Sequence, residues 1–109
     1  MTNKEILIAL VDAFNRCADG DVKSFLYPFY RDGQITQFEL KKMKYMIDLR
    51  NYLCHGGMLE EEVTDNDLLF IAKVVVKIAA TPGVYERLSD YERFFVSNPK
   101  MIVANLKML

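Results

Sequence analysis

The chain has 109 residues, of which 51% are hydrophobic and 27% are charged, a composition typical of one globular domain with a modest core. The formal net charge is −1 and the isoelectric point is about 5.8. No overall basic field therefore attracts nucleic acid, and any contact with nucleic acid has to be local.

The cysteine content and the first residues indicate the cellular compartment. Cys17 and Cys54 do not form a Cys-x-x-Cys pair, and the single histidine cannot complete a common zinc site with them. Small secreted domains are usually rich in disulfides, so we expect two free thiols and neither metal nor cofactor. The first fourteen residues carry Lys4, Glu5 and Asp12 in a helix-like pattern, unlike a signal peptide. No apolar run approaches the ~18 residues of a membrane span, so we expect a cytoplasmic protein without membrane contact.

The N-terminal third predicts two helices. "TNKE" at 2–5 is a capping box, with threonine at the N-cap and glutamate three residues later. The helix that follows is expected to bury Leu7, Leu10, Val11, Phe14 and Ala18. "DGD" at 19–21 ends it, and a short helix of about 22–31 comes next. This second helix carries Phe25, Leu26, Phe29 and Tyr30. Pro28 lies inside it and should shorten or kink it.

The longest predicted helix spans about 37–54. "TQFE" at 36–39 is a second capping box that opens this helix, and Gly56 and Gly57 end it as a glycine C-cap. On a helical wheel, one wide arc is apolar: Leu40, Met43, Met46, Ile47, Leu49, Leu53 and Cys54, extended by Phe38, Tyr45 and Tyr52. The opposite side holds Lys41, Lys44, Asp48 and Asn51.

The C-terminal half predicts further helices. A polar, acidic loop precedes a fourth helix, about 65–80, which is apolar on most faces and therefore central, and Pro82 closes it. Its apolar residues are Leu68, Leu69, Ile71, Ala72, Val75, Val76, Ile78 and Ala79. Helical spacing predicts a fifth helix that carries Val84, Leu88, Tyr91 and Phe95. "SNP" at 97–99 begins a short last helix through Leu106. No alternation of period two occurs, so we predict one all-α domain over residues 1–109.

Arg50 falls inside the apolar arc of the third helix, between the directions of Met43 and Met46. An unpaired buried guanidinium would cost several kcal/mol by order of magnitude. One interpretation is structural: Arg50 extends to solvent or pairs with an acidic residue of the next loop, and this is favoured by the wheel alone. The acidic residues of that loop are Glu60, Glu61 and Glu62. The other interpretation is that Arg50 borders a cleft or a subunit interface and faces a bound anion.

His55 is the only histidine, and it follows the same helix directly. Continued as helix, it would align with Asn51 and Lys44, well round from Arg50. It can approach Arg50 only if the helix loosens at its end or if a second subunit supplies the other residue. A histidine at a helix C-terminus is also a favourable partner of the helix dipole, which is the structural interpretation.

Together these residues give "RNYLCHGG", which is arginine, asparagine, three residues and histidine at the end of a long helix. This pattern resembles the signature of the HEPN superfamily (higher eukaryote and prokaryote nucleotide-binding). That signature is an arginine, four to six residues and a histidine, commonly with asparagine directly after the arginine. The matching positions are Arg50, Asn51 and His55, and the resemblance covers roughly residues 36–81.

The resemblance implies an up-and-down four-helix bundle with one or two additional short helices, usually a homodimer in which two motifs meet across the interface. It also implies metal-independent endoribonuclease activity in a toxin–antitoxin, phage-defence or RNA-processing role, with Arg50, Asn51 and His55 as catalytic residues. RNA is the implied substrate, and a cognate antitoxin or regulatory protein is a further implied partner. Some family toxins carry a modifiable tyrosine two residues after the histidine, where this chain has Gly57.

The chemistry fits the residue types. Metal-independent cleavage uses the 2′-hydroxyl as internal nucleophile, and histidine moves protons near neutral pH. The forked guanidinium of Arg50 matches the charged oxygens of the phosphorane, while Asn51 could orient the phosphate or the histidine. Lys41 and Lys44 could provide a local basic approach for RNA, although a solvated lysine face explains each one as well.

Two other functional classes remain open. One is a non-catalytic HEPN-like module that binds a nucleotide or protein in the same cleft, as an antitoxin or adaptor would. The other is a structural adaptor whose apolar tail "MIVANLKML", residues 101–109, docks on a partner chain. For that tail, packing onto its own bundle is the expected structural alternative.

Overall fold

The computed structural model of this protein is helical throughout the residues that it describes. The described residues are 1–18, 21–58, 62–81, 83, 86 and 98–109. The α-helices in these ranges are α1 (Asn3–Cys17), α2 (Val22–Arg31), α3 (Gln37–Cys54), α4 (Asp65–Ala79) and α6 (Pro99–Lys107), and the same ranges contain no strand. The all-α prediction is confirmed, and the predicted helices at 22–31 and 37–54 agree with α2 and α3 at both ends.

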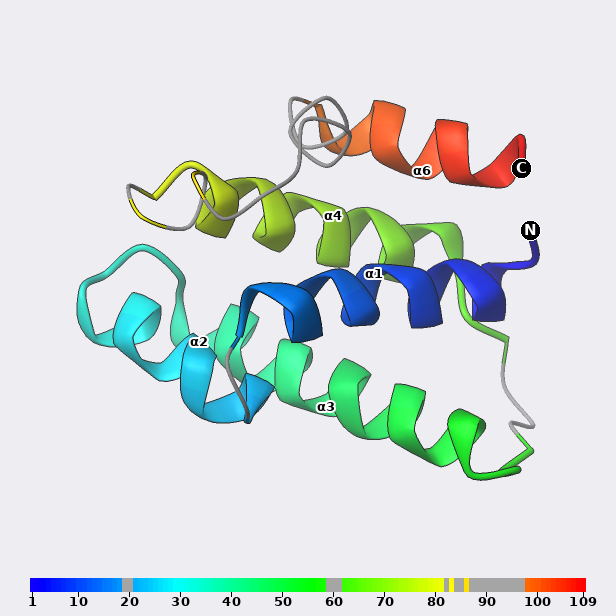
Figure 1. Ribbon diagram of the computed structural model, residues 1–109, viewed down its shortest axis with the longest axis horizontal. Helices are drawn as coiled ribbons and strands as arrows, with labels where there is room; N and C mark the ends of the chain where they lie inside the picture. The colour runs from blue at the N-terminus through cyan, green and yellow to red at the C-terminus, as the bar shows by residue number, and fades with distance from the viewer. Residues whose placement is uncertain (19–20, 59–61, 82, 84–85, 87–97) are drawn as a thin grey trace.

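Four helices form an up-and-down bundle. The chain runs along the long axis in α1, returns in α3, and repeats the reversal in α4 and α6 (Figure 1). Helix α1 packs against α3, α4 and α6, and α4 packs against α6, so α1 and α4 share the centre. The short α2 packs on α3 at one end, and the two termini lie together at the other end (Figure 1). The predicted bundle with an added short helix is therefore confirmed.

Side-chain caps explain where the helices begin. The capping boxes predicted at 2–5 and 36–39 are both present at the starts of α1 and α3. In the second box, the Thr36 hydroxyl accepts from the Glu39 amide at 3.1 Å, and the Glu39 carboxylate accepts from the Thr36 amide at 2.9 Å. A third box, in which aspartate replaces glutamate, opens α4. Each box satisfies two amides that the first helical turn leaves without partners.

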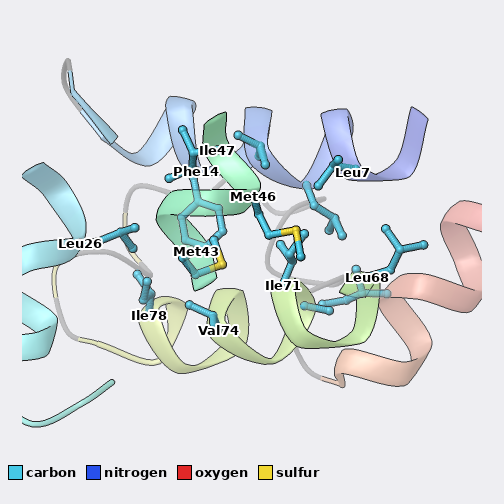
Figure 2. Close-up of a cluster of buried hydrophobic side chains, with 14 of the residues drawn as sticks. Leu7, Phe14, Leu26, Met43, Met46, Ile47, Leu68, Ile71, Val74 and Ile78 are labelled. Carbon is cyan, nitrogen blue, oxygen red and sulfur yellow. The ribbon is translucent and has the colours of Figure 1, made fainter. Parts of the chain in front are cut away.

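The core lies between α1, α3 and α4, with contributions from α2 and α6. Figure 2 shows Met43 and Met46 of α3 directed between α1 and α4, where they meet Ile71 and Val74 of α4. The residues that were predicted to be buried in the first helix are buried. The described residues include no buried polar or charged residue, so burial of apolar surface is the main stabilising contribution.

The predictions for the C-terminal part have different outcomes. Helix α6 packs on α4 and α1, and its Ile102 and Val103 are buried, so the tail is part of its own bundle. The predicted fifth helix at Val84, Leu88, Tyr91 and Phe95 lies outside the described residues, as does Pro82. No helix in the described ranges combines the length and the apolar character needed to cross a membrane.

Glu39 links the start of α3 to the end of α4 and should make stability depend on pH. Its Oε2 lies 2.8 Å from Lys77 Nζ. Burial raises the pKa of Glu39, but the bonds to Lys77 and Thr36 outweigh burial and hold it below its ordinary 4.5. A lowered pKa stabilises the fold above the ordinary pKa, and that contribution is lost as the pH falls through the folded value.

We therefore expect Glu39→Gln to unfold at a lower temperature than wild type at pH 7, with a difference that shrinks as the pH falls below the ordinary pKa of 4.5. Thermal unfolding followed by circular dichroism measures both midpoints. The control is Glu62→Gln, because Glu62 is exposed and has no partner among the described residues. A difference between wild type and Glu39→Gln that stays constant with pH would show that the carboxylate charge is not the cause.

Candidate functional site

The end of α3 has the glycine C-cap that the sequence predicts. His55 is the C-cap residue, and Gly56 after it has a φ of +84°, which L side chains rarely adopt. The Gly56 amide donates to the Leu53 carbonyl at 3.3 Å, and the Gly57 amide donates to the Tyr52 carbonyl at 2.9 Å. These two bonds form a Schellman motif, so the helix ends sharply at His55 rather than loosening.

Gly57 has a second role at this turn, because the ring of Tyr52 covers it. A Cβ atom at residue 57 would lie 2.5 Å from Cδ1 of Tyr52. The Tyr52 hydroxyl donates to the Met58 carbonyl at 3.1 Å, which holds the ring in place. The position at which some HEPN toxins carry a tyrosine therefore has no room for a side chain while Tyr52 keeps this position.

Arg50 lies between α1 and α3 and is paired. Its Nη2 is 2.6 Å from Oδ1 of Asp12, and its Nη1 donates to Oδ1 of Asn51 at 3.1 Å. The side chain of Arg50 is 23% exposed and that of Asp12 is 38% exposed. Within one chain, this pair agrees with the structural interpretation that Arg50 contacts an acidic residue, but the residue is Asp12 of α1. The predicted loop partners are wrong for Glu62, which is exposed and makes no such pair, while Glu60 and Glu61 lie outside the described residues.

The Nε of Arg50 is buried and has no hydrogen-bond partner within the described part of the chain. An arginine has five N–H donors in a planar fork. Asp12 and Asn51 each accept one of them, so the terminal nitrogens keep further donors for an oxyanion. Asp12 and Asn51 therefore fix the direction of the guanidinium, while some of its N–H donors remain without an acceptor.

His55 is exposed at the C-cap, and the described residues offer its imidazole no hydrogen-bond or ion-pair partner. Residues five positions apart on a helix point about 140° away from each other. His55 therefore projects from α3 on a different side from Arg50, as the helical wheel predicts. One chain brings Arg50 together with Asn51 and Asp12, but it does not bring His55 to them.

The two predicted RNA-binding lysines lie in different surroundings. Lys41 is exposed and lines a groove, with no ion-pair partner among the described residues. Lys44 is half-buried, and its Nζ lies 5.8 Å from the ring centroid of Tyr27 in α2. Lys41 is therefore free to contact a ligand, whereas Lys44 is partly engaged in a cation–π contact.

The sequence did not reveal the groove, which lies between α3 and the segment that leads into α4. It has a volume of about 560 Å³ and is lined by Phe38, Lys41, Lys42, Tyr45, Met46, Leu49, Glu62, Val63 and Asp67. Phe38 and Tyr45, which the wheel assigns to the apolar arc, are 68% and 59% exposed. Tyr52 continues this row one heptad later and is 53% exposed. The recurrence of an aromatic residue every seven positions was the available signal.

Within the described ranges, no group of three or more histidine, cysteine, aspartate and glutamate residues could hold a metal ion. No model of a known protein family, no curated protein and no solved structure matches this chain. A functional proposal therefore depends on the chemistry of the residues themselves and on the resemblance of "RNYLCHGG".

Proposed function

We propose that this protein is a metal-independent endoribonuclease of the HEPN type, with Arg50, Asn51 and His55 as its catalytic residues. The observation that carries the proposal is the arrangement at the end of α3. A guanidinium fixed by Asn51 and Asp12 retains free donors, and an exposed imidazole follows it five residues later. A fixed cation and a proton-transferring group are the two components that RNA cleavage without a metal requires.

The proposed reaction is an internal transesterification. The 2′-oxygen attacks the adjacent phosphorus, and the bond from phosphorus to the 5′-oxygen breaks. A base removes the proton of the 2′-hydroxyl, and an acid protonates the departing 5′-oxygen, which gives a 2′,3′-cyclic phosphate and a 5′-hydroxyl. The phosphorane gains negative charge during this step, and the remaining donors of Arg50 would stabilise it.

A homodimer would supply what one chain lacks. Arg50 and His55 of one chain point about 140° apart, so one phosphate would not meet both of them. The single histidine of each chain can remove the proton of the 2′-hydroxyl and then deliver a proton to the departing 5′-oxygen. Two copies related by a two-fold axis would place Arg50 of one subunit near His55 of the other.

A mixed dimer tests this composite site. Arg50→Ala and His55→Ala, each carrying a different tag, are co-expressed and purified through both tags. Each variant alone should be inactive, whereas the mixed dimer should keep one complete pair and about half of the wild-type cleavage rate. A mixed dimer as inactive as its parents would show that Arg50 and His55 act within one subunit, and an active monomer would exclude the composite site.

The same proposal covers biological role and regulation. A ribonuclease of this size fits a cytoplasmic toxin, phage-defence or RNA-processing enzyme whose activity a cognate antitoxin or regulatory protein limits. Gly57 and the covering Tyr52 ring argue against control by modification of a tyrosine at residue 57. A regulator of this protein would have to act by another route, such as covering the end of α3.

The ion pair with Asp12 favours a second candidate, a non-catalytic module that binds a nucleotide or a protein at the same place. A carboxylate 2.6 Å from the guanidinium neutralises part of the charge that a phosphorane would need. RNA or nucleotide binding that weakens in Arg50→Ala, without any turnover by the wild type, would support this candidate over the ribonuclease.

A further inference from the structure

The groove beside α3 has an apolar floor and aromatic walls. Met46 and Val63 are buried beneath it, and Leu49 is half-buried beside them. Phe38 and Tyr45 lie on the walls with more than half of each side chain exposed. The Phe70 ring of α4 packs against the Phe38 ring in a T-shaped arrangement, with a centroid distance of 6.1 Å. A surface of this kind fits a flat, apolar ring system rather than a solvated chain.

Two exposed aromatic side chains follow each other along α3 at the groove. Seven helical residues separate Phe38 from Tyr45, which corresponds to about 10.5 Å along the axis of α3. The two rings therefore offer successive stacking surfaces to bases of one strand. Stacking on aromatic side chains is the usual way in which proteins hold single-stranded nucleic acid.

The charged residues that line the groove are two lysines and two carboxylates. The groove therefore differs from the uniformly basic surfaces that bind a phosphate backbone. Lys42 Nζ lies 3.5 Å from Asp67 Oδ1 and 4.7 Å from the ring centroid of Phe70. Asp67 also accepts from the Thr64 amide in the capping box, so Lys42 and Asp67 are already engaged. Lys41 and Glu62 remain, and each is exposed and without a partner among the described residues.

These two free groups match the two ends of a nucleotide. Lys41 can hold the anionic phosphate, and the Glu62 carboxylate can accept from an exocyclic amino group of a base. Cytosine, adenine and guanine carry such a group, and uracil does not. A second copy of this chain could also cover the apolar groove. Such a contact would, however, give the charges of Lys41 and Glu62 no evident role.

We propose that the groove is a nucleobase subsite that prefers bases with an exocyclic amino group, with Phe38 and Tyr45 as stacking residues and Glu62 as the selecting residue. The inference rests on the proposed function because RNA is taken as the ligand. Tyr52 lies on α3 between this groove and His55, so a strand that stacks on Phe38, Tyr45 and Tyr52 would approach the end of α3.

Fluorescence anisotropy with labelled 12-mers of oligo(C) and oligo(U) tests the subsite in a His55→Ala background, which keeps the RNA intact. Phe38→Ala and Tyr45→Ala should each weaken binding of oligo(C) by about 5- to 100-fold. Glu62→Ala should lower the ratio of oligo(C) affinity to oligo(U) affinity, because alanine cannot accept from the amino group and the lost charge affects both oligonucleotides alike. Met101→Ala is the matched control, because Met101 is also 54% exposed but lies on α6.

Binding that none of the groove substitutions changes would overturn the inference. The same holds if Tyr45→Ala leaves RNA binding intact but converts a dimer into monomers in analytical ultracentrifugation, because a second copy would then cover the aromatic residues. The ribonuclease proposal fails separately. A wild type that cannot cleave RNA, but whose binding still depends on Tyr45 and Glu62, would refute catalysis and retain the subsite.

Discussion

His55→Ala is expected to lower RNA cleavage by about 100- to 10,000-fold, the range that a general acid or base contributes. The imidazole is exposed and has no partner among the described residues, so its loss should leave the unfolding temperature nearly unchanged. Single-turnover cleavage of a labelled RNA, together with a thermal unfolding curve of each variant, separates the two effects.

Cys54→Ala is the matched control for this prediction. Cys54 is the neighbouring residue in the last position of α3, and its thiol is exposed and free. Its removal alters the same helix end without touching a proposed catalytic group, so the variant should cleave RNA as fast as wild type. Equal losses of activity in Cys54→Ala and His55→Ala would indicate a local structural effect and would remove His55 from the mechanism.

Asp12→Ala is expected to destabilise the protein more than any other substitution around the site. The free energy of unfolding should fall by about 1–3 kcal/mol. The change leaves Arg50 wedged between α1 and α3 with its main partner gone, while its Nε is already unsatisfied. The estimate is below that for a fully buried pair, because both side chains keep partial contact with water, which screens the charge. Chemical denaturation of wild type and variant measures the difference.

The double variant Asp12→Ala/Arg50→Met shows whether the stranded charge is the cause. Methionine keeps much of the apolar length of arginine but carries no charge, so the double variant should recover a large part of the lost free energy of unfolding. A double variant that is as unstable as the sum of the two single variants would mean that the carboxylate and the guanidinium do not depend on each other.

Local chemistry made the helices predictable. The threonine and glutamate pairs at 2–5 and 36–39 cap α1 and α3 because both partners of each box lie within four residues of one another. Gly56 and Gly57 ended α3 for the same reason, since the Schellman bonds also connect close neighbours. The apolar spacing of α1 identified its buried face, because period and burial are linked in any amphipathic helix.

The tertiary contacts could not be predicted from the sequence, because they depend on how the helices pack against one another. The wheel showed that Arg50 needs a partner, but nothing local indicated Asp12, which lies 38 residues earlier on α1. It also placed Phe38 and Tyr45 in the apolar arc, although both residues stay more than half exposed and line a groove. The packing of α3 against α1 and α2, rather than closely along α4, leaves that side of α3 open.

The most direct test of the ribonuclease proposal is the incubation of single-stranded RNA with the wild-type protein in EDTA, followed by identification of the new ends. The proposed chemistry predicts cleavage with 2′,3′-cyclic phosphate and 5′-hydroxyl ends, and the loss of cleavage in both Arg50→Ala and His55→Ala. RNA that stays intact, cleavage that requires a divalent ion, or products with 5′-phosphate ends would contradict it.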